Sequence, residues 1–138
     1  MANTLEDLKN RRSCRSYQPR QITEEELQQV LEAGMYAPTG MGKQSPVIVA
    51  VQDKDAIETL RKMNAAILGA PEADPFYGAP TVLIVLADRS RPTYLYDGSC
   101  VMSNLLNAAQ AAGLGARWVH PAREEFRSDG GEALLERW

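Results

Sequence analysis

The chain has 138 residues, of which 44% are hydrophobic and 24% are charged, and its formal net charge is −3. This length and composition are typical of one soluble globular domain spanning residues 1–138. Net acidity disfavours nucleic acid or an anionic membrane surface as the main partner. Two cysteines exclude a disulfide framework, a single histidine excludes a multi-histidine metal site, and no metal site is predicted.

The first two helices are predicted from capping patterns. Residues 4–7 form a weak capping box, with Asp where Glu or Gln is preferred, and open a short helix toward Arg11. Thr23 to Glu26 form a stronger one, followed by apolar residues at helical spacing to about Tyr36. The stretch between these helices, RRSCRSYQPRQ, has no periodicity and is expected to be an ordered loop or an extended strand.

The rest of the chain alternates strands and helices. Continuous apolar runs at 47–51 and 81–87 predict strands covered on both faces, because polar residues do not alternate with the apolar ones. A helix at about 55–68 separates them, a third short strand is expected at 116–120, and a helix at 132–138 closes the chain. This order predicts an α/β or α+β sandwich.

One uncharged stretch, Gly98 to Ala116, is long enough to cross a bilayer. Five polar side chains interrupt it and two glycines close it, so we interpret it as a helix buried in protein: Ser99, Ser103, Asn104, Asn107 and Gln110, then Gly113 and Gly115. The N-terminus lacks the apolar run of a secretory signal. We therefore expect a cytoplasmic protein that does not bind membranes.

Three arginines within five residues, Arg11, Arg12 and Arg15, form the most distinctive cluster. They suit either a solvated basic loop or a phosphate clamp, because guanidinium groups match phosphate oxygens bidentately and remain charged. Ser13 adds a hydroxyl donor to the second interpretation.

Two other segments are candidates for ligand contact. The stretch APTGMGKQSP at 37–46 is not a P-loop, since no Ser or Thr follows Lys43, but Gln44 can hydrogen-bond the edge of a heterocycle. A plain helix-to-strand connection is the alternative. Trp118 and His120 in the predicted third strand are more often structural than functional. No nucleophile–base pair is visible, and anion-binding groups without a catalytic constellation favour a bound cofactor that carries the chemistry.

Three stretches together resemble the nitroreductase family of FMN-dependent oxidoreductases: RRSCRSY, APTGMGKQSPVIVAV and DGSCVMSNLLNAAQAAGLGARWVH. The resemblance covers essentially the whole chain. It implies an α+β fold, a three-layer α/β/α sandwich, in an intertwined homodimer with two FMN sites at the interface. It also implies hydride transfer from NAD(P)H by way of flavin N5 to a nitroaromatic, a quinone or a similar electron-poor acceptor.

The resemblance assigns site residues as follows. Arg11, Ser13 and Arg15 would bind the phosphate and the polar edge of the ring, with Arg12 nearby. The ribityl chain and ring would lie along Pro38, Thr39, Gly40, Met41 and Gln44. The strand that faces flavin N5 would supply Trp118, Val119 and His120. Arg15 or Lys43 is expected to place positive charge near flavin N1.

Three features depart from the family pattern. Gly42 stands where the family usually has Asn, and Pro121 has no N–H to offer the flavin. The sequence ends at Trp138, where relatives continue with a further strand and a basic C-terminal segment. We expect the absence of that segment to weaken FMN binding. The alternative function is therefore a truncated or degenerate flavin-binding dimer without efficient turnover. An RNA-binding module is disfavoured, because the sequence shows neither an aromatic platform nor a broad basic stripe.

Overall fold

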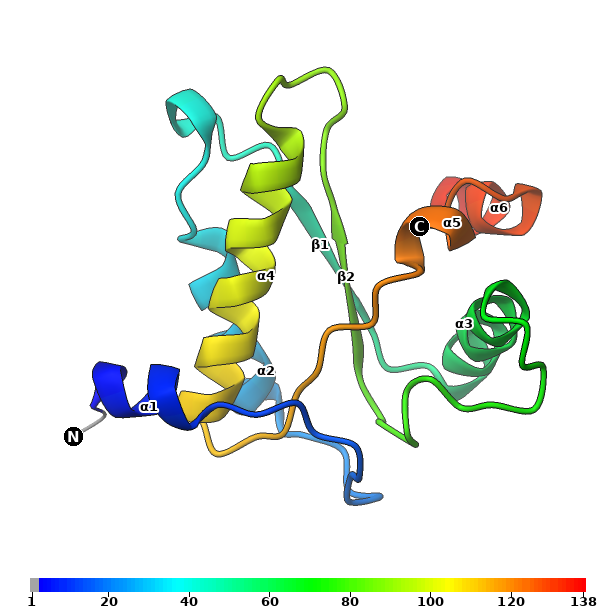
Figure 1. Cartoon of the computed structure of the whole chain (residues 1–138), viewed down its shortest axis with the longest axis horizontal. Helices are drawn as coiled ribbons and strands as arrows, with labels where there is room; N and C mark the ends of the chain where they lie inside the picture. Colours follow the sequence, from blue (N-terminus) through cyan, green and yellow to red (C-terminus); the bar gives the residue numbers. More distant parts are fainter. Residues whose placement is uncertain (1–2) are drawn as a thin grey trace.

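The computed structural model describes residues 3–138. In chain order its elements are α1 (Thr4–Asn10), α2 (Glu24–Met35), the short 3-10 helix η1 (Gly40–Gly42), β1 (Val47–Val51), α3 (Lys54–Ile67), β2 (Val82–Leu86), α4 (Tyr94–Ala111), α5 (Ala122–Glu125) and α6 (Asp129–Arg137). β1 and β2 are antiparallel, with Val49 opposite Ile84, and they lie between α2 with α4 on one side and α3 with α5 and α6 on the other (Figure 1). The antiparallel pairing places the chain in the α+β class.

The two faces of the β1–β2 pair contact two separate parts of the core, as the unbroken apolar runs predict. Ile48, Leu83 and Val85 pack toward the cluster that α2 and α4 build around Val30, Val101, Leu105 and Ala109. Val49, Val51 and Ile84 pack on the other side, with Leu60 of α3 and Phe76. Successive strand residues point to opposite faces, so a strand covered on both faces has no solvent side to receive polar residues.

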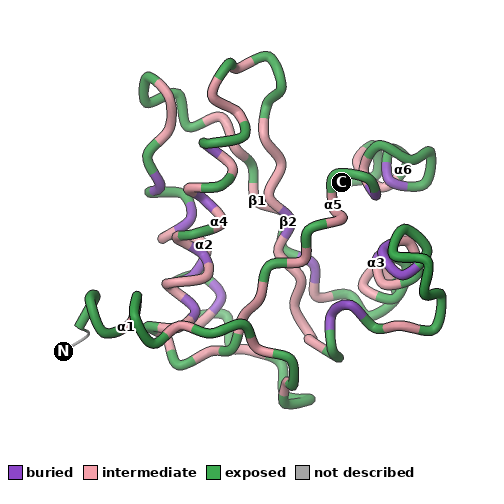
Figure 2. The backbone as a smooth tube through the Cα atoms, in the orientation of Figure 1, coloured by how far each residue is buried: buried purple, intermediate pink, exposed green. Residues whose placement is uncertain are grey.

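The two predicted capping boxes have different outcomes. At α2 the Thr23 hydroxyl accepts from the Glu26 N–H at 3.1 Å, and the Glu26 carboxylate accepts from the Thr23 N–H at 2.7 Å. At α1 the cap is Asn3, whose side chain makes no capping hydrogen bond, and Thr4 is already helical. α1 buries none of its residues and is exposed along its length (Figure 2). The weak box was therefore wrong in detail although the helix itself is present.

The third predicted strand does not form. Within the described residues, segment 116–120 contributes only one isolated parallel bridge, between Ser13 and Ala116. A short run with strand propensity becomes a strand only where a partner edge meets it. Here a cavity of about 640 Å³ separates the second edge of β2 from the segment that follows α4. The sheet of residues 3–138 therefore has two strands.

The long central helix begins four residues before the uncharged stretch, at Tyr94, and so includes the charged residue Asp97. No helix within residues 3–138 combines the length and the hydropathy needed to cross a bilayer. Asn104 points into the molecule, where its side-chain amide donates to the Ala33 carbonyl of α2 at 2.8 Å. This polar group therefore serves the contact between α2 and α4.

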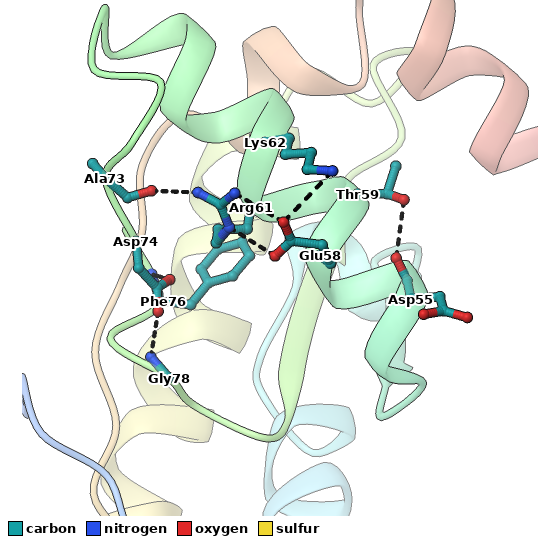
Figure 3. Close-up of polar contacts among 9 residues, drawn as sticks. All are labelled: Asp55, Glu58, Thr59, Arg61, Lys62, Ala73, Asp74, Phe76 and Gly78. Carbon is teal, nitrogen blue, oxygen red and sulfur yellow. Dashed lines mark hydrogen bonds and ion pairs between the residues drawn. The ribbon is translucent and has the colours of Figure 1, made fainter.

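Polar contacts fix the segment between α3 and β2. The guanidinium of Arg61 pairs with Glu58 at 2.7 Å and donates to the Ala73 carbonyl at 2.7 Å (Figure 3). The Asp74 carboxylate accepts from the N–H groups of Phe76 and Gly78 at 3.0 and 2.6 Å. These contacts turn the chain so that the Phe76 side chain enters the core beside Leu60.

Candidate cofactor site

Within the described residues, Arg12 of the arginine cluster donates hydrogen bonds to the chain itself, whereas Arg11 and Arg15 have no such bond from their side chains. Arg12 donates to the carbonyls of Lys9 and Arg11 at 2.7 and 2.9 Å and so satisfies backbone acceptors at the end of α1. Within residues 3–138, neither Arg11 nor Arg15 has a carboxylate partner, whereas Arg20 in the same loop pairs with Glu26 at 3.5 Å. Among the described residues, Arg11 and Arg15 therefore have guanidinium groups without an internal partner, whereas Arg12 uses Nη1 internally. Contact of any of the three with an anion remains a prediction.

The arginine loop, residues 11–20, is fixed to the segment after α4. The Cys14 N–H donates to the Ala116 carbonyl at 3.0 Å, beside the Ser13–Ala116 bridge. A Cβ at Gly115 would lie 2.7 Å from the Cys14 sulfur, so this close approach requires glycine. The sequence pattern indicated a helix C-cap for Gly113, and its φ of 74° is in the left-handed region that such a cap uses.

Tyr17 completes the fixation of this loop. Its hydroxyl donates to the Cys14 carbonyl at 3.2 Å. Burial, helped by the neighbouring Cys14 and opposed by Arg117, raises the pKa of Tyr17 to about 12. Tyr17 therefore stays neutral over the working pH range and acts as a hydrogen-bond donor. Arg117 itself lies 4.7 Å over the ring of Tyr77 in a cation–π contact.

The loop at 37–46 is held by its own side chains. The Gln44 amide nitrogen donates to the carbonyls of Met35 and Ala37 at 2.8 and 3.2 Å, and its oxygen accepts from the Thr39 hydroxyl at 2.6 Å. Both N–H groups of Gln44 are thus used within the loop. A contact from Gln44 to a heterocycle remains a prediction, limited in this conformation to one free lone pair on its oxygen.

Three residues of this loop have left-handed backbone conformations: Met41 with φ of 55°, Gly42 with 62° and Gln44 with 49°. A Cβ at Gly42 would meet no atom within 4 Å, so the backbone rather than crowding favours glycine there. Met41 is 88% exposed, and Pro38 and Lys43 are exposed as well. The loop therefore presents its tip to solvent in a strained shape that neighbouring contacts must maintain.

Two residues that sequence patterns did not single out support this loop. The carboxylate of Asp97 accepts from the Gly40 N–H and from the Thr93 hydroxyl, each at 2.9 Å. Neither residue was given a role, because the uncharged stretch interpreted as a helix starts at Gly98, just after Asp97.

The third predicted segment contributes one core residue and two exposed side chains. Val119 packs against the core cluster that contains Phe76, whereas Trp118 and His120 are exposed. The bridge at Ala116 brings the start of this segment beside the arginine loop. Contact of Trp118, Val119 or His120 with a flavin remains a prediction.

The two loops expected to bind one ligand lie at opposite ends of α4. Gly40 is bonded to Asp97 in the first turn of α4, whereas Ser13 pairs with Ala116 beyond its last turn (Figure 1). A helix of 18 residues is about 27 Å long. One chain therefore brings the arginine loop to segment 116–120 but does not bring it to the loop at 37–46.

Large apolar side chains are exposed around the loop at 37–46. They belong to the end of α2, the loop itself, the start of β1 and the start of α4: Met35, Tyr36, Met41, Val47, Leu95 and Tyr96. Exposed apolar groups gathered in this way are typical of an interaction surface.

The profile of the nitroreductase family matches residues 8–127. The chain belongs to the nitroreductase family. A solved nitroreductase with bound FMN from Bacteroides fragilis superposes with a TM-score of 0.90 at 27% identity, over 99% of this chain and 80% of that one. An FMN-dependent nitroreductase from Clostridium difficile superposes with a TM-score of 0.76 at 29% identity, over 96% of this chain and 69% of that one. The α+β sandwich is thus the nitroreductase fold.

Curated nitroreductase relatives are longer than this chain. Two archaeal proteins, from Methanothermobacter thermautotrophicus and Archaeoglobus fulgidus, are each 31% identical over 93% of this chain, and the matches cover 66% and 74% of their lengths. Both carry the provisional name NADH dehydrogenase/NAD(P)H nitroreductase. The FMN reductase [NAD(P)H] of Bacillus subtilis is 33% identical over 66% of this chain and 34% of its own length.

Proposed function

We propose that this nitroreductase-family chain binds FMN and acts as an FMN-dependent oxidoreductase. Bound FMN would supply the redox chemistry, a two-electron transfer from NAD(P)H to a nitroaromatic, a quinone or a similar electron-poor acceptor. The observation that carries the proposal is a pair of guanidinium groups, Arg11 and Arg15, that have no carboxylate partner within residues 3–138 and lie on a fixed loop of a nitroreductase fold. Their charge and fork geometry suit the phosphate of FMN.

We further propose that each FMN site takes residues from two copies of the chain. The arginine loop and the loop at 37–46 are separated by the length of α4, about 27 Å, which is more than one FMN molecule is expected to span. A two-fold axis can place the arginine loop of one copy beside the second loop of its partner. The apolar side chains around Met41 and Tyr96 then become buried in the homodimer.

Within such a site the chain binds, orients and supplies charge. Arg11, Ser13 and Arg15 hold the phosphate and the polar ring edge, while residues 38–41 lie along the ribityl chain and ring. Arg15 or Lys43 places positive charge where the reduced ring gains negative charge. Lys43 is exposed and forms no ion pair within residues 3–138, so its ammonium group is available for this role.

The test is an FMN titration of wild type, Arg11→Gln, Arg15→Gln and a control, Arg20→Gln. The control removes an arginine from the same loop that already pairs with Glu26. Loss of one charge-assisted phosphate contact is expected to weaken binding about tenfold or more at Arg11 and Arg15, and to leave the control within about twofold. Equal affinity of all four proteins, or failure of wild type to take up FMN, would overturn the proposal.

The second candidate is a flavin-binding dimer without efficient turnover. Two observations favour it: Gly42 offers no side chain to a ligand, and both N–H groups of the Gln44 amide are used inside the loop. Bleaching of the bound flavin absorbance by NADPH and its return on addition of a nitroaromatic would establish turnover. A protein that binds FMN but keeps its absorbance under NADPH and under NADH would establish this second candidate instead.

A further inference from the structure

Asp97 is a buried acid without a cationic partner among residues 3–138. It is 4% exposed, in the first turn of α4, and it has no ion pair within the described residues. Burying a carboxylate is costly unless hydrogen-bond donors replace water. The hydrogen-bond donors around the Asp97 carboxylate therefore indicate the structural role of this residue.

Each carboxylate oxygen of Asp97 accepts a hydrogen bond from a different donor. Oδ1 accepts from the backbone N–H of Gly40, 57 positions away in the chain, and Oδ2 accepts from the Thr93 hydroxyl one turn earlier. Both distances are 2.9 Å. The first turn of a helix is also where a negative charge is favoured by the helix dipole. Asp97 is thus stabilised by its own helix and is free to hold a distant backbone group.

Gly40 is shaped to meet this anchor. A Cβ at Gly40 would overlap the Thr93 side chain, so the loop backbone lies directly against the residue that shares the Asp97 carboxylate. Gly40 also accepts from the Lys43 N–H at 3.3 Å, which closes η1. Any shift of Gly40 is therefore transmitted to Met41, Gly42 and Lys43.

Among the described residues, the other hydrogen bonds of the loop do not reach α4. Gln44 binds the carbonyls of Met35 and Ala37 at the end of α2, and Thr39 binds Gln44. Within residues 3–138, the Gly40–Asp97 bond is the hydrogen bond that joins residues 38–45 to α4. It holds a segment with three left-handed residues whose tip is exposed.

We propose that Asp97 is a positioning residue that presets the loop at 38–45 for the flavin. The proposal rests on the proposed function and adds a residue outside the expected flavin contacts. Asp97 acts through Gly40, because their hydrogen bond fixes the position and orientation of η1 relative to α4. Preorganisation of this kind lowers the entropy that a ligand would otherwise lose on ordering the loop.

Two substitutions at Asp97 distinguish a variant that keeps both hydrogen bonds from a variant that loses them. In Asp97→Asn, the amide oxygen accepts from the Gly40 N–H and the amide nitrogen donates to the Thr93 oxygen, so both contacts survive. In Asp97→Ala both are lost. Gly40→Ala is the matched variant in the loop, because it leaves the carboxylate in place and displaces the backbone from Thr93.

Hydrogen exchange on the FMN-free protein gives the first readout. We expect amides at 39–45 to exchange about tenfold faster in Asp97→Ala and in Gly40→Ala than in wild type, with α3 unchanged as the internal reference. Asp97→Asn is expected to remain within about twofold of wild type. Exchange at 39–45 that stays at the wild-type rate in both Asp97→Ala and Gly40→Ala would overturn the proposal.

FMN affinity gives the second readout. Asp97→Ala and Gly40→Ala are expected to bind FMN about tenfold more weakly than wild type, and Asp97→Asn is expected to restore most of the affinity. Faster exchange with unchanged FMN affinity would overturn the positioning role. If wild type fails to take up FMN, the proposed function falls, while the exchange data still decide whether Asp97 anchors the loop.

Discussion

At the scale of single residues, Glu125 shows how burial sets the properties of an acid. It is 3% exposed, its Oε1 has no hydrogen-bond partner among the described residues, and the same holds for both amide atoms of its neighbour Asn64. Burial raises the pKa of Glu125 above its ordinary value of 4.5, and the nearby Asn64 amide opposes only part of that rise. The folded chain therefore holds this proton more tightly than the unfolded chain does.

The sign of the pH dependence follows from that difference. Above pH 4.5 the unfolded chain releases the proton while the folded chain keeps it, so stability falls as pH rises toward the raised pKa of Glu125. Glu125→Gln removes this titration. We expect wild type and variant to melt together near pH 4, and the variant to be more stable by about 1 kcal/mol at pH 7.5.

Melting curves of the two proteins from pH 4 to pH 8 test this expectation. For a chain of this size, 1 kcal/mol corresponds to a shift in Tm of about 3–6 °C. A Tm difference that is constant across the whole range would contradict the assignment of the pH dependence to Glu125.

At the scale of elements, helix caps and core contacts decide local stability. Thr23 caps α2 through a complete capping box, whereas Thr4 is the first helical residue of α1 and caps nothing. Thr23→Ala should lower the free energy of unfolding by about 1 kcal/mol, and Thr4→Ala, its matched control, should change it by less than about 0.5 kcal/mol. Urea denaturation measures both, and equal effects would show that the box contributes nothing specific.

Helix α3 offers a second matched pair. Leu60 is 1% exposed in the core with Phe76 and Ile84, whereas Leu68 at the C-cap of the same helix is 54% exposed. Leu60→Ala is expected to cost about 2–5 kcal/mol because it leaves a cavity, and Leu68→Ala about 0.5 kcal/mol or less. Urea midpoints of the two variants compare the effects. Similar midpoints would mean that the α3 side of the sheet is not tightly packed.

At the scale of the whole molecule, the separation of the two candidate loops leads to a complementation experiment. Variant one carries Arg11→Gln and Arg15→Gln, and variant two carries Gln44→Ala, which removes the loop bonds to Met35 and Ala37. Each variant alone is expected to bind FMN poorly. If every site takes one loop from each copy, a mixed dimer combines two intact loops in one site and two altered loops in the other.

Mixing the two variants under subunit exchange should therefore restore wild-type FMN affinity at one site per mixed dimer. The titration of the mixture, compared with each variant alone, gives this result directly. A mixture that binds no better than its components would mean that both loops serve the same site within one chain, contrary to the separation along α4.

Much of the fold could be predicted from local patterns. The apolar runs identified β1 and β2, and the box at Thr23 with the helical spacing after it located α2. The helix expected at about 55–68 matches α3, and the uncharged stretch located most of α4. These signals are local because they reflect hydrogen bonds and burial within a few residues. Local patterns failed at segment 116–120, where a strand needs a partner edge, and at Asp97, whose main contact lies 57 positions away.

The sequence by itself determined strands β1 and β2, most of the helices and the residue types that suit an anion-binding cofactor. Only the tertiary structure decided that Arg12 serves α1, that Arg11 and Arg15 remain available, and that the two candidate loops lie at opposite ends of α4. The physical reason is range. Propensity and periodicity act over a few residues, whereas the partner of a guanidinium or a carboxylate depends on which distant segments the packed core brings together.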